Sequence, residues 1–161
     1  INRCKRKKIK FLSSPFDLKS IELLKKFKLN LLKIPSGEIT NVPYLKKIGA
    51  LKKKIILSTG MSDMKEVKSA IKILTSSGTK KKNITVLHCS SEYPANEDNL
   101  NLLSIPYLKK KLKLNVGYSD HSSGLQASLT AVALGAKIIE KHFTTNKKLS
   151  GPDHKASISP K

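Results

Sequence analysis

The chain has 161 residues, of which 39% are hydrophobic and 27% are charged, a composition typical of one globular domain and not of a disordered or fibrous chain. Lysine and arginine outnumber aspartate and glutamate by 32 to 11, for a formal net charge of +21, yet arginine occurs only at Arg3 and Arg6 and aromatic residues make up 5%. Nucleic-acid sites favour arginine and interleaved aromatics, so we expect no nucleic-acid partner and a positive field that attracts small anionic substrates.

Short β-branched runs alternate with longer amphipathic stretches along the chain. Six runs predict strands, at Lys8–Ser13, Leu31–Pro35, Lys54–Ser58, Ile84–Cys89, Asn115–Ser119 and Lys137–His142. Three stretches with apolar residues at helical spacing predict helices, at Ser20–Phe27, Lys65–Thr75 and Leu125–Leu134. For the second helix, Ser62 or Asp63 is the expected N-cap and Gly78 the expected stop.

The alternation of strand and helix predicts parallel strands, in either an open sheet or a barrel. Every predicted strand ends in a polar cluster, and the clusters recur at intervals of about one strand–helix unit. An open sheet concentrates its site at one switch point, whereas a barrel collects residues from the end of every strand. The pattern therefore favours an α/β fold, a partial (β/α)8 TIM barrel over residues 1–161. A closed barrel needs eight units and this chain supplies six, so we expect a fragment.

Two histidines end neighbouring predicted strands. His121 and His142 are 21 residues apart, or one strand–helix unit, so both imidazoles should reach one metal ion. By strand alternation Ser119 should share a face with His121, and Glu140 with His142. Two histidines with open positions suit Mn²⁺, Fe²⁺ or Zn²⁺, with water and substrate oxygens completing the shell. The alternative is that each is a separate polar residue at a barrel rim.

Other polar residues at the strand ends suggest an anion site. Lys33 interrupts an apolar run, so we expect it to need a partner, such as an anionic substrate, unless it lies at a frayed strand start. Four serines at matching strand ends provide hydroxyl donors that, with nearby glycines, suit a phosphate or carboxylate: Ser14, Ser36, Ser58 and Ser119. The segment Ser150–Ser157 should carry Asp153 and His154 over the barrel mouth, unless it is an ordinary polar loop.

Read in order, the strings SSPFD, KIPSGEITN, ILSTGM, LHCSSEYPA, VGYSDHSSG, EKHFT and GPDHKAS resemble the N-acetylneuraminate (sialic acid) synthase family. The resemblance covers roughly Phe11 to Ser157, and the ordered set is far more specific than any single string. It implies condensation of phosphoenolpyruvate with N-acetylmannosamine to give N-acetylneuraminate and phosphate. It also implies a divalent ion held by His121 and His142, Mn²⁺ with Mg²⁺ or Co²⁺ as alternatives. In the family this ion polarises the sugar aldehyde.

The resemblance assigns the remaining roles by position. Catalytic roles fall on Glu38 and Lys33. Contacts to phosphate and carboxylate fall on Ser14, Lys33, Ser36, Ser58 and Ser119, and contacts to the sugar on Glu92, Tyr93 and Asp153. Two positions depart from the family pattern: Ser14 stands where many relatives have threonine, and Glu92 where some have asparagine. Glu92 keeps legionaminate or pseudaminate synthesis open.

The resemblance also implies parts that these residues do not supply. The family's first two strands carry a catalytic glutamate, and its small antifreeze-like C-terminal domain lends an arginine to the partner in a domain-swapped homodimer. We therefore expect the chain alone to be inactive, and its open sheet edges to make it prone to aggregation. A non-catalytic remnant of such an enzyme and, much less favoured, a basic nucleic-acid-binding module are the alternatives.

Compartment is expected from simpler features. No apolar run reaches the roughly 18–20 residues that span a membrane, and no signal peptide is visible. Cys4 and Cys89 match no disulfide, metal or redox spacing. We therefore expect a protein of the reducing cytoplasm with no membrane partner.

Overall fold

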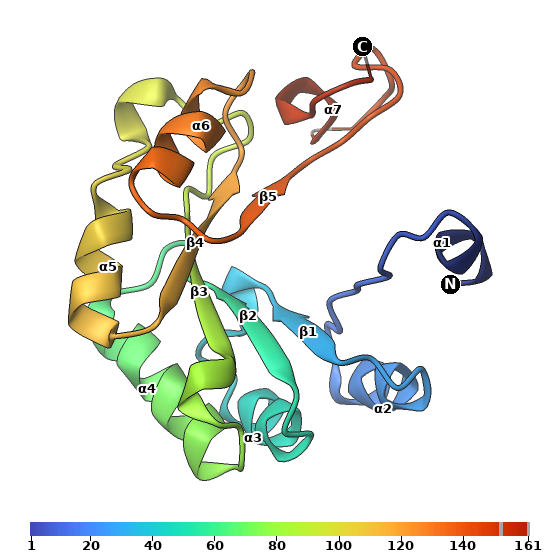
Figure 1. The fold of residues 1–161 in the computed structure, drawn as a ribbon, viewed down its shortest axis with the longest axis vertical. Coiled ribbons are helices and arrows are strands. Elements are labelled where there is room, and N and C mark those ends of the chain that lie inside the picture. The colour runs from blue at the N-terminus through green and yellow to red at the C-terminus, as the bar shows by residue number, and fades with distance from the viewer. Residues whose placement is uncertain (152, 161) are drawn as a thin grey trace.

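Five parallel strands form one curled sheet in the computed structural model, which describes residues 1–151 and 153–160. Each strand pairs with its neighbours in chain order, so the sheet order is β1-β2-β3-β4-β5. Figure 1 shows the sheet curving with helices on its convex side, as in part of a (β/α)8 barrel, which confirms the predicted fold class. The strands are β1 (Leu31–Ile34), β2 (Lys54–Ser58), β3 (Ile84–Cys89), β4 (Asn115–Asp120) and β5 (Ile139–Lys141).

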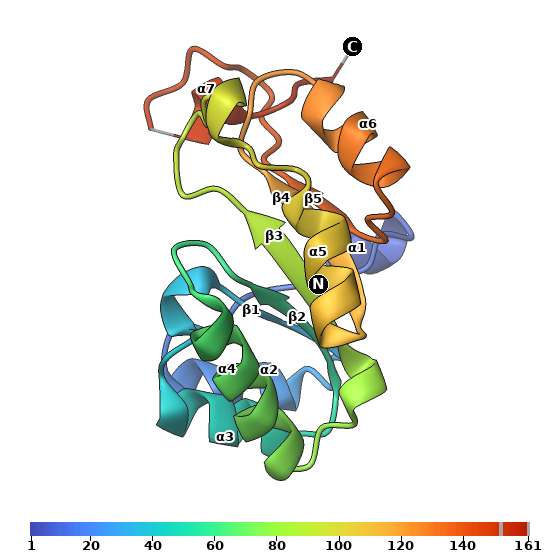
Figure 2. The same cartoon turned by 90° about the vertical axis from the view of Figure 1, so that its left-hand side faces the viewer.

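Helices connect the strands and cover the convex face. Figures 1 and 2 show α3, α4 and α5 side by side along the outside of the sheet. The three helices expected from the sequence form within two residues of their predicted ends, as α2, α4 and α6. The helices are α1 (Asn2–Arg6), α2 (Leu18–Lys26), α3 (Val42–Ala50), α4 (Met64–Ser76), α5 (Ser104–Leu112), α6 (Gln126–Ala133) and α7 (Asp153–Ala156). Short 3-10 turns lie at Ser36–Glu38, Lys81–Asn83 and Glu97–Asn99.

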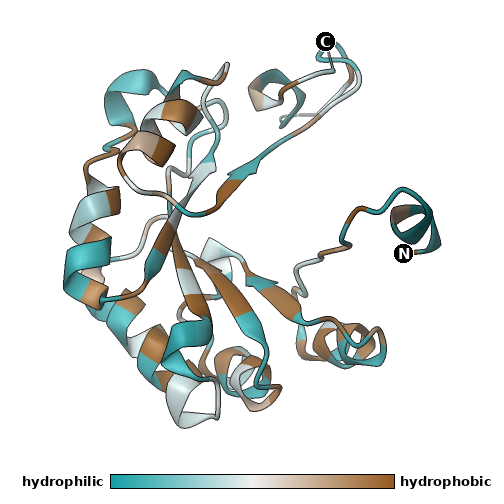
Figure 3. Cartoon of the chain, viewed as in Figure 1, coloured by the Kyte–Doolittle hydropathy of each residue, from teal (hydrophilic) through white to brown (hydrophobic). Residues whose placement is uncertain are grey.

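Strand side chains alternate between an apolar outer face and a more polar inner face. Outward residues such as Leu32, Ile55, Val86 and Val116 join one core cluster with the helices. Figure 3 shows mostly brown, hydrophobic residues along β1 to β3 and alternating brown and teal residues along the helices around them. The inner face, on the concave side, carries polar or small side chains toward the strand ends: Lys33, Ser58, Cys89, Ser119 and Glu140. The concave face is therefore free to hold a polar site.

One predicted strand does not form. Residues 9–16 are neither helix nor strand, so the sheet has five strands and not six. Their apolar side chains find little to pack against, since Ile9 is 64% and Phe16 69% exposed. Hydrogen bonds to a neighbouring strand do not by themselves offset the entropy lost when a strand is ordered, unless its apolar side chains are also buried. The last strand is also shorter than the predicted Lys137–His142, although the backbone N–H of Lys137 still donates to Val116 O.

Lysine runs lie at the end of the sheet where helices finish and strands begin. Lys109–Lys111 lie in the last turn of α5, where cations suit the helix dipole, and Lys52–Lys54 lie just after α3. Lys80–Lys82 fall farther from a helix end, four residues or more after α4.

Within the part of the chain that the structure describes, no helix is both long and apolar enough to cross a bilayer.

The N-terminus of α4 provides a test of the local structure. Asp63 Oδ1 accepts from the backbone N–H groups of Lys65 at 2.7 Å and Glu66 at 2.8 Å, and Glu66 Oε2 accepts from Asp63 N at 2.9 Å. This reciprocal capping box selects Asp63 over Ser62 as the N-cap. We expect Asp63→Ala to lower the free energy of unfolding by about 1 kcal/mol in urea denaturation. Asp63→Asn, which keeps the accepting oxygen, should change it little; equal losses in both would contradict the capping assignment.

Candidate functional site

The two histidines lie side by side where β4 and β5 end. His121 directly follows β4 and His142 directly follows β5, and their ring centroids are 5.3 Å apart. Tyr93, from the loop after β3, stacks on His121 at 4.0 Å and meets His142 edge-on at 5.6 Å. The expectation that these two imidazoles come together is confirmed. The ring of Tyr93 packs against both of them.

His121 is oriented by a backbone carbonyl. Its Nδ1 lies 2.7 Å from Ser90 O, and since a carbonyl only accepts, Nδ1 carries the proton. Nε2 therefore keeps its lone pair, with Ser119 Oγ 3.4 Å away, as strand alternation predicts. Burial lowers the pKa of His121, which favours the neutral imidazole. A neutral histidine whose other nitrogen donates to a carbonyl has the form in which histidine binds metals.

His142 is less firmly held than His121. Its Nδ1 lies 3.9 Å from Asp153 Oδ2, which places Asp153 beside the pair as predicted. Among the described residues, no group of three or more His, Cys, Asp or Glu side chains is arranged to bind a metal. The two imidazoles thus fit an ion only if water or substrate oxygens supply the other ligands, which suits a catalytic site with open positions.

Lys33 has the partner that a lysine inside a strand was expected to need, and that partner belongs to the chain itself. Its Nζ donates to Glu140 Oε1 at 3.0 Å, across the concave face from β1 to β5. Ser119 Oγ donates to the same oxygen at 2.7 Å. Lys33 is buried as the third residue of β1, so it does not lie at a frayed strand start. Two of the predicted anion-binding groups therefore converge on one carboxylate.

The four predicted serines are in different environments. Ser36 Oγ accepts from Gly60 N at 2.9 Å and lies 3.4 Å from Cys89 Sγ. A Cβ at Gly60 would come within 3 Å of both of these side-chain atoms, so a larger residue there would displace them. Ser58 Oγ is buried with no hydrogen-bond partner among the described residues, which leaves it available to a ligand. Ser14 lies half-buried in the unpaired segment before α2, so it does not end a strand.

The two remaining acidic candidates, Glu38 and Glu92, accept hydrogen bonds from residues of their own loops. Glu38 accepts from Asn41 Nδ2 at 2.7 Å. Glu92 accepts from Asn96 N at 3.0 Å and from Asn99 Nδ2 at 2.9 Å. In this arrangement Glu92 orders the loop that carries Tyr93, and neither carboxylate is engaged by the histidine pair.

Sequence reasoning missed a buried ion pair next to the site. Asp120 Oδ2 lies 2.9 Å from Lys141 Nζ, and the side chains are 0% and 6% exposed. Burial tends to raise the pKa of Asp120, but hydrogen bonds from Ser122 and Ser128 and the Lys141 ammonium together hold it below its ordinary value. Both residues lie inside the quoted strings VGYSDHSSG and EKHFT, directly before the histidines.

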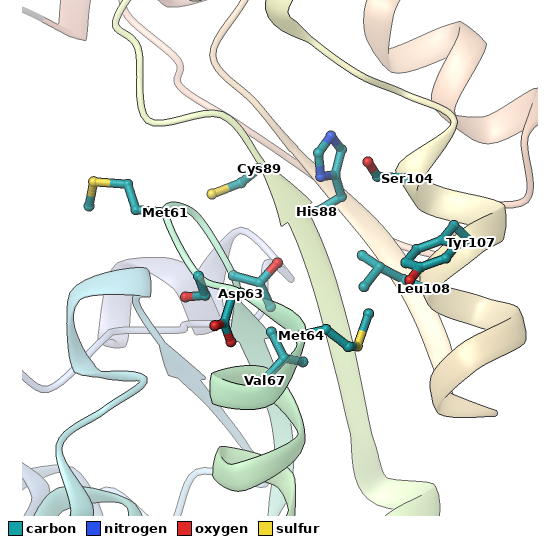
Figure 4. A pocket seen from close by; sticks show the side chains of 11 residues that line it. Met61, Asp63, Met64, Val67, His88, Cys89, Ser104, Tyr107 and Leu108 are labelled. Carbon is teal, nitrogen blue, oxygen red and sulfur yellow. The ribbon is translucent and has the colours of Figure 1, made fainter.

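A separate cavity lies on the outer side of β3, between α4 and α5 (Figure 4). Its volume is about 330 Å³, and Met61, Met64, His88 and Tyr107 are among its lining residues. His88 Nε2 lies 2.7 Å from Leu100 O, and burial lowers the pKa of His88. His88 is therefore a hydrogen-bonded neutral residue of the outer face, and its cavity does not include the histidine pair.

Comparison with known proteins shows which family the chain resembles. The NeuB family model matches residues 1–161. N,N'-diacetyllegionaminic acid synthase of Campylobacter jejuni is 57% identical over 160 residues, covering 99% of this chain and 48% of that protein. The synthase of the same name from Legionella pneumophila is 46% identical over 154 residues, covering 94% and 43%. The crystal structure of N-acetylneuraminic acid (sialic acid) synthetase from Leptospira borgpetersenii matches with a TM-score of 0.92 at 38% identity, covering 98% of this chain and 54% of that one. The chain thus spans about half the length of these relatives.

The Lys33–Glu140 contact predicts a measurable coupling between the first and last strands. The side chain of Lys33 is only 10% exposed, so Glu140→Gln leaves the Lys33 ammonium buried without a counter-charge. We expect urea denaturation to show a loss of about 1–3 kcal/mol, moderated because Glu140 is 38% exposed. Lys33→Met combined with Glu140→Gln should recover part of that loss. The surface pair of Lys47 and Glu22 is the control, since Glu22→Gln should have little effect; similar losses at both pairs would refute the coupling.

Proposed function

The chain belongs to the NeuB family, and we propose that it forms part of the catalytic barrel of a nonulosonic acid synthase. The reaction condenses phosphoenolpyruvate with an N-acyl hexose and releases phosphate. The observation that carries this proposal is the placement of two imidazoles 5.3 Å apart, next to the cluster of Lys33, Ser119 and Glu140 on the concave face. The candidate metal ligands thus lie beside the candidate anion-binding groups on the concave face, with Lys33 reaching them from β1 at the other edge of the sheet.

His121 and His142 are the residues that would hold a divalent ion, Mn²⁺ with Mg²⁺ or Co²⁺ as alternatives. When bound, the ion supplies Lewis-acid polarisation of the sugar aldehyde, which makes its carbon a better target for C3 of phosphoenolpyruvate. Tyr93 covers one face of His121 and restricts the access of water to that side. Asp153, beside His142, is placed to accept a hydrogen bond from a sugar hydroxyl.

Lys33 and Ser119 are the groups we assign to phosphoenolpyruvate. Glu140 accepts from both, so its carboxylate is the anion that these two donors hold in this structure. An incoming phosphate or carboxylate would take over these donors, with charge-assisted hydrogen bonds to the buried ammonium. Ser58, whose hydroxyl has no partner among the described residues, adds a further donor. Ser36 acts indirectly, by fixing the backbone at Gly60.

The acceptor sugar has two candidates. The motif resemblance implies N-acetylmannosamine. A diacetamido hexose is favoured by the two relatives named N,N'-diacetyllegionaminic acid synthases, at 57% and 46% identity, because a diacetylated product requires an acceptor with two acetamido groups. Glu92 orders the loop next to the site, and its departure from the family pattern is consistent with this second sugar.

Metal binding by the chain itself gives the first test. Binding of Mn²⁺ reduces the electron paramagnetic resonance signal of the free aqueous ion, so titration yields a dissociation constant. We expect one site, and a loss of affinity of at least about tenfold in His121→Ala and in His142→Ala. His154→Ala is the matched control and should bind as the wild type does, since His154 is hydrogen-bonded to Thr144 instead. Equal affinity in all three variants would exclude the histidine pair as the metal site.

Turnover requires an enzyme of family length. Residues 1–161 can replace the matching 160 residues of the Campylobacter jejuni synthase, and phosphate release from phosphoenolpyruvate is then measured with each candidate sugar. We expect the chimera to be active and His121→Ala to abolish its activity. A folded chimera that releases no phosphate with either sugar would contradict the proposed function and favour a catalytically incomplete remnant.

A further inference from the structure

The residues immediately before the two histidines form the most deeply buried ion pair of the described chain. Asp120 and Lys141 are direct Cα partners in the β4–β5 ladder, and their side chains meet at 2.9 Å. Because successive side chains on a strand point to opposite faces, this pair lies on the helix-covered side, behind the imidazoles of His121 and His142. The pair therefore joins the two strands one residue away from the site.

Further hydrogen bonds extend this contact to the turn and helix after β4. Asp120 Oδ1 accepts from Ser122 N at 2.9 Å and from Ser122 Oγ at 2.6 Å, and Asp120 Oδ2 accepts from Ser128 Oγ of α6. Lys141 Nζ also donates to Ser122 O at 2.8 Å. One carboxylate and one ammonium thus fix β5, the turn after β4 and the start of α6 relative to one another.

The two histidines depend on this network to different degrees. His121 has its own anchors, through Nδ1 to Ser90 O and through its carbonyl, which accepts from Ala95 N at 2.9 Å. His142 follows an edge strand of three residues; its carbonyl accepts from Ile158 N at 2.9 Å, and the nearest polar partner of its ring is Asp153 at 3.9 Å. Among the described residues no hydrogen bond orients the His142 ring directly, so its position follows from its backbone, which is held by β5 against β4 on one side and by Ile158 on the other.

We propose that Asp120 and Lys141 are positioning residues for the metal site: their ion pair holds β5 against β4 so that His121 and His142 keep the spacing that one divalent ion requires. This inference rests on the proposed function, since it assumes that the histidines bind a metal. A purely structural ion pair makes a different prediction. Its loss would reduce stability, but the folded molecules would bind the ion as well as before.

Manganese titration by electron paramagnetic resonance on the full chain, with circular dichroism to measure the folded fraction, separates these roles. For Lys141→Met we expect the affinity per folded molecule to fall by about 10–100-fold, as for removal of groups that orient metal ligands. Lys141→Arg, which retains the charge, should restore most of the affinity. Ser128→Ala removes one hydrogen bond to Asp120 and no charge, so it should fold and show a smaller loss.

Leu74→Ala is the matched control for lost stability, because Leu74 is fully buried in α4 away from the site. We expect it to be destabilised yet to bind Mn²⁺ with wild-type affinity when folded. Wild-type binding with undiminished affinity in Lys141→Met and Ser128→Ala would overturn the positioning role alone. No binding by the wild-type chain would overturn the proposed metal site and the positioning role with it.

Discussion

The pairing of β4 with β5 is the interaction on which the site depends. It brings His121 and His142 together, and it aligns Ser119 with Glu140 as Cα partners. Gly117 makes the close approach possible, because a Cβ at that position would lie 2.5 Å from Ile138 O. A side chain there would force the segment before β5 away from β4. The arrangement of the strand ends thus depends on a steric constraint two residues before Ser119 in β4.

The two faces of the sheet have different roles: the outer face packs against the helices, and the concave face carries the candidate site. Burial of the outward side chains against the helices supplies the hydrophobic stabilisation. That leaves the concave face free to carry a lysine, serines and a glutamate, whose burial is tolerated because each charge has a partner. Glu140 meets this requirement for Lys33. The same glutamate therefore both stabilises the fold and holds Lys33 and Ser119 in place.

Periodicity and strand-end polarity were sufficient to predict the fold class, the α4 cap region and the histidine pair, because these follow from spacing within one element or one strand–helix unit. The partner of Lys33 could not be found in this way, since Glu140 is 107 residues away and the contact depends on the curl of the sheet. The Asp120–Lys141 pair was missed for a different reason: it has the same spacing as the histidines, but it lies on the face of the sheet away from the polar residues on which the sequence analysis concentrated. Lys8–Ser13 had the pattern of a strand, but whether it pairs depends on burial that the pattern does not report.

We propose that the strand ends of β4 and β5 form a metal site next to an anion site. Anomalous diffraction at the manganese edge, from crystals grown with Mn²⁺ and phosphoenolpyruvate, tests it most directly. We predict one anomalous peak roughly 2.0–2.3 Å from Nε2 of His121 and from a ring nitrogen of His142. Phosphoenolpyruvate should lie beside it, against Lys33 and Ser119. A peak elsewhere, or bound phosphoenolpyruvate with no ion at the histidines, would contradict the account.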